Sequence, residues 1–210
     1  MRLGRAASAK PLCANFGYSR GTPIDRHYIE SFLEAHKADI QGSVLEIGDD
    51  TYSRRFGGSR ITRQEILQLD PRPPATIVGD LSEPGVLPEH AFDCIVLTQT
   101  LHLIYDMPAA VAQLQRSLKP GGVLLVTVPG ITPIDRGEWK ESWFWSLTEQ
   151  SVARLLGDAF GTAQVGATTY GNLFAATAFL HGAALEEVGT ARLQPLDPSY
   201  PVTVAARAVA

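Results

Sequence analysis

The chain has 210 residues, of which 45% are hydrophobic and 19% charged, as expected for an ordinary globular protein of one domain with a substantial core. Its formal net charge of -4 and its lack of a basic run argue against nucleic-acid binding. No apolar run reaches the roughly 20 residues that span a bilayer. Cys13 and Cys94 are the only cysteines, so neither a disulfide framework nor a zinc site is expected. We therefore predict a soluble cytoplasmic protein that has no membrane partner and holds no metal.

The first half of the chain predicts a helix and then a run of buried strands. The short basic start, residues 1–15, is expected to be a disordered or loosely ordered tail before a single domain over 16–210. The first helix should run from Pro23 to Lys37, with Thr22 as its N-cap. Strands are predicted over 43–48, 66–70, 75–79 and 92–98. Their Val, Ile and Leu runs lack alternation, which favours a parallel sheet with helices on both faces. The segment between the first two strands is short, so its crossover helix should be brief.

The second half predicts further strands, separated by helices and one long connection. A helix near 107–117 leads into a strand over 122–128. Residues 129–146 form an aromatic-rich connection, which in a compact domain usually covers a site. The remaining elements are expected to be a helix near 149–158 with Thr148 as N-cap, a strand over 163–169, a long apolar helix over 172–188 and a final strand over 202–209. The apolar helix could be covered by a second subunit, which would make the protein a homodimer.

Three predicted strands each end in an acidic residue or a tight turn. Glu46 and Gly48 close the first strand. Asp70 closes the second, and Asp80 the third. At the shared edge of a parallel sheet, Asp70 could accept hydrogen bonds from both ribose hydroxyls, and Asp80 with Leu81 could contact an adenine amino group. The alternative is that these carboxylates only cap turns.

This order of signals resembles the class I S-adenosylmethionine-dependent methyltransferases. Residues 92–97 and 118–125, the latter with a Pro-Gly-Gly lead-in, resemble the fourth and fifth strands of that family. Residues 22–30 and the turn 170–172 resemble a subgroup found beside, or fused to, glycosyltransferases. The resemblance implies a Rossmann-like α/β fold with a seven-stranded, mostly parallel sheet and an antiparallel C-terminal strand beside the fifth. It also implies S-adenosyl-L-methionine as cofactor.

The loop after the first strand departs from the family. Its usual Gly-x-Gly-x-Gly sequence lets the backbone approach the cofactor closely. Here only Gly48 remains, and Asp49, Asp50, Thr51 and Tyr52 fill the other positions. We expect these side chains to hold the methionine end of the cofactor, where the added carboxylates could either bind its amino group or repel its carboxylate.

The acceptor is expected beyond the fourth strand. In the resembled enzymes the residues at this place, here Thr98 and Gln99, line the cofactor. His102 follows them and is the candidate base, because an imidazole with a pKa of about 6.5 can take a proton from a hydroxyl near neutral pH. Arg136, in the long connection, is the second catalytic candidate. His102 could instead be satisfied by the backbone or face solvent, and the tryptophans of the connection could fill the core.

The opening helix carries Asp25 and Arg26. In the resembled enzymes this helix often folds over the cofactor. A solvated helix start, where an acidic residue complements the helix dipole, is the other interpretation.

The resemblance implies a methyltransferase that acts on a small-molecule acceptor, and O-methylation of a sugar or natural-product hydroxyl is the favoured reaction. Two alternatives stay open: an enzyme of this fold that catalyses a cyclisation or elimination, and a non-catalytic nucleoside-binding partner protein. A nicotinamide-dependent oxidoreductase is disfavoured, because the Gly-x-Gly-x-x-Gly fingerprint is missing after the first strand.

Overall fold

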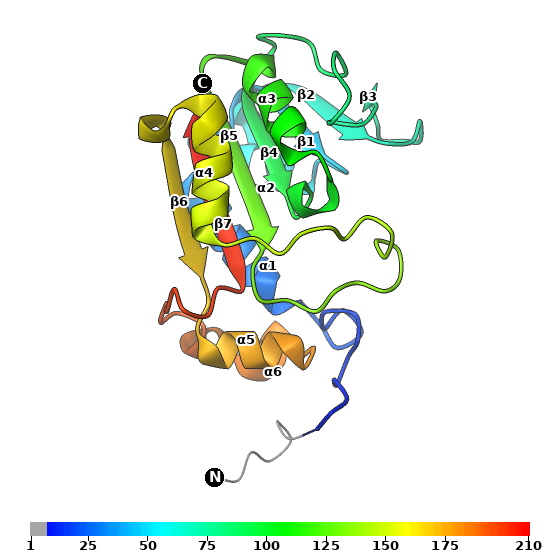
Figure 1. Ribbon diagram of the computed structural model, residues 1–210, viewed down its shortest axis with the longest axis vertical. Helices are drawn as coiled ribbons and strands as arrows, with labels where there is room; N and C mark the ends of the chain where they lie inside the picture. The colour runs from blue at the N-terminus through cyan, green and yellow to red at the C-terminus, as the bar shows by residue number, and fades with distance from the viewer. Residues whose placement is uncertain (1–7) are drawn as a thin grey trace.

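One seven-stranded sheet organises residues 8–210, the part of the chain that the computed structural model describes (Figure 1). The strands are β1 (Gly42–Ile47), β2 (Ile61–Gln68), β3 (Ile77–Val78), β4 (Phe92–Thr98), β5 (Leu118–Pro129), β6 (Val165–Tyr170) and β7 (Thr203–Val209). Their order is β3-β2-β1-β4-β5-β7-β6. The pairs from β3 to β5 are parallel, whereas β7 is antiparallel to both β5 and β6. The predicted mostly parallel sheet with an antiparallel last strand is confirmed.

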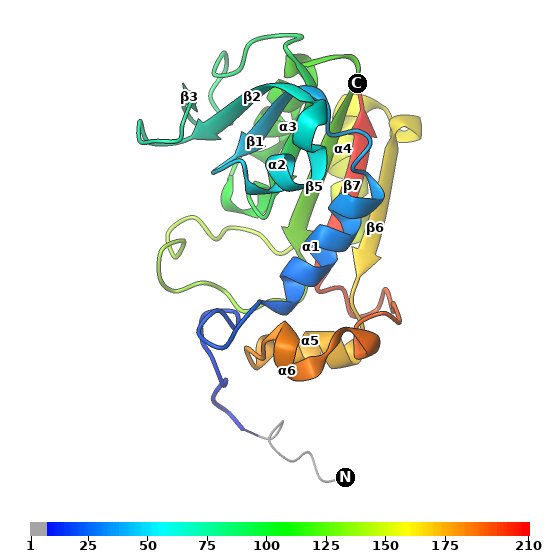
Figure 2. The ribbon, with the colours of Figure 1, turned by 180° about the vertical axis from the view of Figure 1, so that it is seen from behind.

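Helices cover both faces of this sheet. Figure 2 shows α1 (Ile24–Ala35) and α2 (Thr51–Gly57) on one face, and Figure 1 shows α3 (Met107–Ser117) and α4 (Glu149–Phe160) on the other. Two further helices, α5 (Leu173–Leu180) and α6 (Leu185–Val188), lie beyond the carboxyl end of β5. Within residues 8–210, none of the helices has the length and apolar character that crossing a membrane requires.

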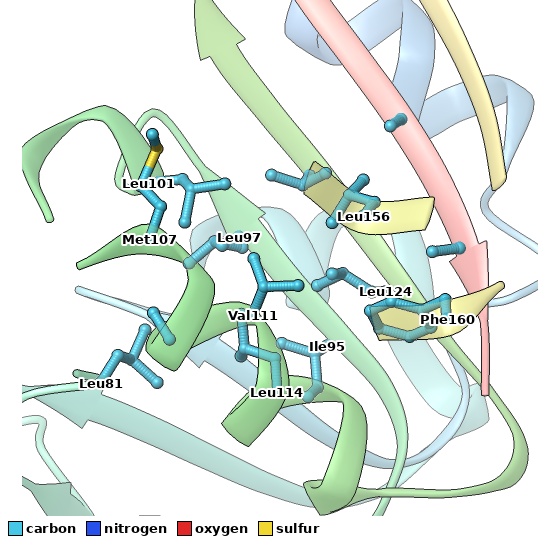
Figure 3. Packing of buried hydrophobic residues seen from close by; sticks show 14 of the residues in the cluster. Leu81, Ile95, Leu97, Leu101, Met107, Val111, Leu114, Leu124, Leu156 and Phe160 are labelled. Carbon is cyan, nitrogen blue, oxygen red and sulfur yellow. The ribbon is translucent and has the colours of Figure 1, made fainter. Parts of the chain in front are cut away.

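The larger core cluster lies between the sheet and the α3–α4 layer (Figure 3). Leu97 and Leu124 contribute from the sheet, Val111 and Leu114 from α3, and Leu156 from α4, and each is at most 1% exposed. Burying a side chain of this size stabilises the fold by about 1.5–3 kcal/mol. This layer therefore fixes the strand ends at which the candidate site lies.

Several predicted boundaries are confirmed because a local signal sets them. The strand over 92–98 and the helix over 107–117 have the predicted limits. Thr148 caps α4 through its Oγ1, which accepts a hydrogen bond from the Ser151 amide at 3.2 Å. The brief crossover helix between β1 and β2 is α2, which has 7 residues.

The predicted cap of the first helix is wrong. The helix α1 begins at Ile24, and Pro23 occupies the cap position without a side-chain hydrogen bond. Thr22 instead donates from its amide and its hydroxyl to the Glu186 carboxylate, at 2.9 and 2.6 Å. A tertiary contact with α6 therefore outcompetes the local capping pattern.

Two strands begin earlier than predicted. The strand β2 starts at Ile61, five residues before the predicted start, because its first half lies near the sheet edge and carries polar, partly exposed residues. It also ends at Gln68, and Leu69 is 66% exposed. The strand β5 starts at Leu118, and its Pro-Gly-Gly segment forms an irregularity opposite Asp93 rather than a lead-in before the strand.

The single helix predicted over 172–188 is also wrong. The chain turns at Gly182, where φ is +68° and an added Cβ would lie 2.0 Å from the Cys13 carbonyl oxygen. Only glycine tolerates both the left-handed backbone and the close approach. One glycine in an apolar run therefore divides the segment into α5 and α6.

The N-terminal segment explains that close approach. Of the predicted loose tail, residues 1–7 lie outside the described part of the chain. The prediction does not hold for Leu12 and Cys13, whose amides donate to the His181 carbonyl at 2.7 and 3.4 Å. Cys13 is 8% exposed. This segment is packed against the end of α5.

Candidate functional site

The carboxyl ends of β1, β2 and β3 meet at one edge of the sheet. The Gly48 amide donates to the Leu67 carbonyl at 2.9 Å, and the Gly79 amide donates to the Gln68 carbonyl at 3.0 Å. Gly48 has φ of +92°, and a Cβ placed there would meet no atom within 4 Å. The turn after β1 therefore has a glycine backbone that faces open space.

Glu46 points toward the start of α2. Its carboxylate is buried, 2% exposed, and accepts hydrogen bonds from the backbone amides of Tyr52 and Ser53 at 3.1 and 2.7 Å. Burial raises the pKa of Glu46 to about 7, against the lowering effect of these hydrogen bonds. Glu46 thus anchors the loop after β1 through the two backbone amides at the start of α2.

The two aspartates of that loop are both engaged locally. Asp49 accepts a hydrogen bond from the amide of exposed Thr51 at 2.8 Å. Asp50 forms an ion pair with Arg54, one turn along α2. Asp49 also lies close enough to Glu46 for its charge to raise the pKa of that buried carboxyl further. The hold of both aspartates on the methionine end stays a prediction.

The carboxylates after β2 and β3 differ in their surroundings. Asp70 is exposed, and within residues 8–210 its carboxylate has no hydrogen-bond donor. Asp80 accepts from the amide and hydroxyl of Ser82 at 2.8 and 2.7 Å, so it also closes a turn. Leu81 is 4% exposed and belongs to the main core. Of the three, Asp70 has the greatest free capacity for a ligand.

A cavity of about 1010 Å³ lies beside this edge, between the N-terminal segment, α1, the end of β4, the connection over 129–146 and α5. The predicted site residues that line it are Tyr52, Thr98, Gln99, His102 and Arg136. The other predicted residues, Glu46, Gly48, Asp49, Asp50, Thr51, Asp70, Asp80 and Leu81, lie outside its lining. The sequence-predicted residues are therefore divided between the strand ends and the cavity.

Aromatic rings form one wall of the cavity. Trp143 packs edge-on against His102 with ring centroids 4.5 Å apart, and stacks on Phe16 at 6.0 Å. Phe16 in turn contacts Phe179 of α5 at 6.1 Å. Trp145 behaves differently, because its Nε1 donates to the Ile104 carbonyl at 3.0 Å and its ring packs on the core. The core interpretation thus holds for Trp145, whereas Trp143 faces the cavity.

His102 is a neutral, buried member of this wall. It is 2% exposed, and within residues 8–210 its Nδ1 has no hydrogen-bond partner. Burial lowers the pKa of His102 to about 4. The expectation of a pKa near 6.5 is therefore wrong, and the imidazole is uncharged throughout the neutral range.

Amide side chains at the strand ends have unused hydrogen-bonding capacity. Gln99 has φ of +48°, and its buried Nε2 lacks an acceptor among the described residues. Gln68 donates from Nε2 to the Gly48 carbonyl, while its buried Oε1 lacks a donor there. Buried polar atoms without partners are costly. These positions are suited to groups of a bound ligand.

The helix α1 contributes two charged residues, which the sequence alone did not assign to the site. Asp25 and Arg26 both line the cavity, together with Tyr18. Arg26 donates to the hydroxyls of Tyr52 and Tyr18 at 2.7 and 2.8 Å. The available signal was the pair of adjacent opposite charges in the first turn of the helix, which a solvated helix start explains equally well.

Comparison with known proteins places this geometry in a family. A family model described as a methyltransferase domain matches residues 19–160. A search of curated proteins gave no match. Solved structures show the same fold at low sequence identity.

The N-methyltransferase NodS from Bradyrhizobium japonicum WM9, in complex with S-adenosyl-L-homocysteine, is 14% identical with a TM-score of 0.57, over 98% of this chain and 94% of that one. The [4+2]-cyclase SpnF is 16% identical with a TM-score of 0.56, over 98% and 88%. A Haloferax volcanii chain from a complex between the Trm112 methyltransferase activator and a methyltransferase is 16% identical with a TM-score of 0.55, over 97% and 99%. Since the family model covers more than half of the sequence, the chain belongs to the methyltransferase domain family.

Proposed function

We propose that this protein transfers a methyl group from S-adenosylmethionine to a hydroxyl of a small-molecule acceptor, such as a sugar or a glycosylated natural product. The observation that carries the proposal is the aromatic-walled cavity of about 1010 Å³ that begins at the carboxyl end of β4. Ligands bind at this edge in open α/β sheets. A volume of this order accommodates an acceptor larger than a single amino acid or short alcohol.

The residues at the strand ends fit the cofactor. The open space at Gly48 would let the cofactor approach the backbone of the turn after β1. The free Asp70 carboxylate would accept hydrogen bonds from the ribose hydroxyls. The side-chain amide of Gln99, whose Nε2 has no partner among the described residues, follows β4, two strands along the sheet from β2. Asp80 and Leu81 remain our candidates for the adenine contact.

The chemistry asks mainly for positioning. When bound, S-adenosylmethionine supplies a methyl group on a positively charged sulfur. The protein must then hold the acceptor hydroxyl in line with that group and exclude water, which is where most of the rate enhancement would arise. The rings of Phe16, Trp143 and Phe179 would orient the acceptor. His102 would accept the hydroxyl proton, and Arg136 would contact the acceptor from the connection.

Replacing Asp70 with alanine should weaken binding of S-adenosylhomocysteine by about 1.5–3 kcal/mol, because charge-assisted hydrogen bonds to the ribose would be lost. Isothermal titration calorimetry on the wild-type and variant proteins measures this difference. Asp158→Ala is the matched control, since it removes an exposed carboxylate on α4, where Asp158 pairs with Arg154. Equal affinities for all three proteins would exclude Asp70 from the cofactor site.

The activity itself is tested with S-adenosylmethionine carrying an isotopically labelled methyl group and a panel of hydroxylated acceptors. Mass spectrometry should find the label on oxygen in one acceptor class.

A second candidate function is supported by the likeness to the [4+2]-cyclase SpnF, which indicates that this fold can host a reaction other than methyl transfer. Conversion of a compound without uptake of the label would favour that candidate. A wild-type protein that binds neither S-adenosylmethionine nor S-adenosylhomocysteine would contradict the methyltransferase proposal.

A further inference from the structure

Arg26 presents a positive charge to the cavity. Its guanidinium donates to the Tyr52 hydroxyl at 2.7 Å and to the Tyr18 hydroxyl at 2.8 and 3.2 Å. Two arginines of α2 are instead held in ion pairs, Arg54 with Asp50 and Arg55 with Glu30. Within residues 8–210, no carboxylate forms an ion pair with Arg26. A half-buried cation of this kind is suited to an anionic ligand group.

Asp25 presents the opposite charge to the same cavity. Its carboxylate accepts a hydrogen bond from the Arg26 backbone amide at 3.0 Å, and among the described residues it has no side-chain donor. Burial raises the pKa of Asp25 to about 6, and the neighbouring Arg26 charge offsets this effect only in part. The two neighbouring side chains therefore place one negative and one positive group at the cavity.

Arg26 links this pair of side chains to the loop after β1 through its hydrogen bond with Tyr52. Tyr52, which accepts from Arg26, is the second residue of α2, and its backbone amide is held by Glu46. The carboxylates that precede it, on Asp49 and Asp50, are already used within the loop and α2. A positive charge without an ion pair is therefore brought to the start of α2 by α1, through the contact of Arg26 with Tyr52.

We propose that Asp25 and Arg26 together bind the α-amino acid end of S-adenosylmethionine. Arg26 receives the carboxylate and Asp25 receives the ammonium group. An α-amino acid carries these two opposite charges on one carbon atom, which matches two adjacent, oppositely charged side chains. This inference rests on the proposed function and assigns recognition of the methionine end to α1, not to the residues that fill the glycine positions of the loop after β1.

The test compares three thioether ligands that share the adenosine and a neutral sulfur and differ in what extends from that sulfur. S-adenosylhomocysteine has both charged groups, decarboxylated S-adenosylhomocysteine keeps the amine alone, and 5′-methylthioadenosine has neither. Arg26→Met should weaken binding of S-adenosylhomocysteine by about 10-fold or more and leave the other two affinities within about 2-fold. Asp25→Asn should weaken binding of both amine-bearing ligands and leave 5′-methylthioadenosine unchanged. Calorimetry gives each affinity without any acceptor or turnover.

Two control variants separate recognition from structure. Arg55→Met removes an exposed arginine that is paired with Glu30, and should change none of the three affinities. Tyr18→Phe removes one phenol from Arg26 but keeps the cation, and should retain most of the affinity for S-adenosylhomocysteine.

Three results would overturn the inference. In the first, Arg26→Met weakens all three ligands equally, as a merely structural role would. In the second, Arg26→Met and Asp25→Asn leave S-adenosylhomocysteine binding unchanged, so that the pair faces the acceptor. In the third, the wild type binds 5′-methylthioadenosine but not S-adenosylhomocysteine. A wild type that binds none of the three ligands would instead reject the proposed function.

Discussion

Replacing Glu46 with alanine should lower the free energy of unfolding by about 2–4 kcal/mol. The substitution removes the acceptor of two backbone hydrogen bonds, from Tyr52 and Ser53, at a position that is 2% exposed. Each buried amide that loses its partner costs about 1–3 kcal/mol. The loop after β1 would lose its anchor at the same time, so binding of S-adenosylhomocysteine should also weaken.

Urea denaturation followed by circular dichroism measures the change, with exposed Glu89→Ala as the control. Glu46→Gln should lower the free energy of unfolding by less, because the amide oxygen still accepts one hydrogen bond.

The raised pKa of Glu46, about 7 against an ordinary 4.5, means that the folded state favours the protonated form. Its contribution to stability is therefore fully present below about pH 4.5 and declines as pH rises through about 7. Glu46→Gln should abolish this dependence of stability on pH. A Glu46→Ala variant that is as stable as the wild type would contradict the role of Glu46 as an anchor of the loop after β1.

Replacing His102 with alanine should lower kcat by about 100-fold or more, as expected for loss of a general base. The affinity for S-adenosylhomocysteine should barely change, because the base acts on the acceptor in the transition state. The measurement uses the acceptor found by the labelled-methyl screen. His102→Phe is the sharper variant, since it keeps a ring against Trp143 at the position where the centroids are 4.5 Å apart. If the phenylalanine variant retained turnover, His102 would serve packing alone.

At low pH, the fall of kcat should follow protonation of the buried His102 imidazole. Because burial lowers the pKa of His102 to about 4, the group remains a free base throughout the neutral range. The rate should therefore hold from neutral pH to about pH 5 and fall as pH approaches 4, where the imidazole becomes protonated. A rate that falls with a midpoint near pH 6, and loses that midpoint in Asp25→Asn, would assign the fall to the Asp25 carboxyl, whose pKa burial raises to about 6.

Much of the sheet was predictable because its strands are buried on both faces. The strand over 92–98 has continuous apolar residues and ends where it is predicted to end. The start of β2 was not predictable in this way, because edge residues such as Arg63 are exposed and carry no apolar pattern. Likewise, the break at Gly182 depends on the approach of Cys13, a contact between distant parts of the chain. Local patterns do not encode such contacts.

The site was predictable where backbone topology alone determines position. The ends of β1 and β2 meet because parallel neighbours end at one edge. Side-chain direction was not predictable, and it changes the interpretation of single residues. Glu46 turns inward to α2. The pKa of His102 could not be read from the sequence either, because burial by Trp143 and its neighbours determines it.

The position of β7 in the sequence determines the order in which two parts of the candidate site form during synthesis, the strand ends and the wall of the cavity. Within residues 8–210, β6 pairs only with β7, so it has no strand partner until β7 has been synthesised. The helix α5 follows β6 directly and carries Phe179, while His181 receives the N-terminal segment. A growing chain that has completed β1 to β5 already has the strand ends that would bind a nucleoside. It gains the wall of the acceptor cavity later, because that wall depends on contacts of long sequence separation, such as that between Phe16 and Phe179.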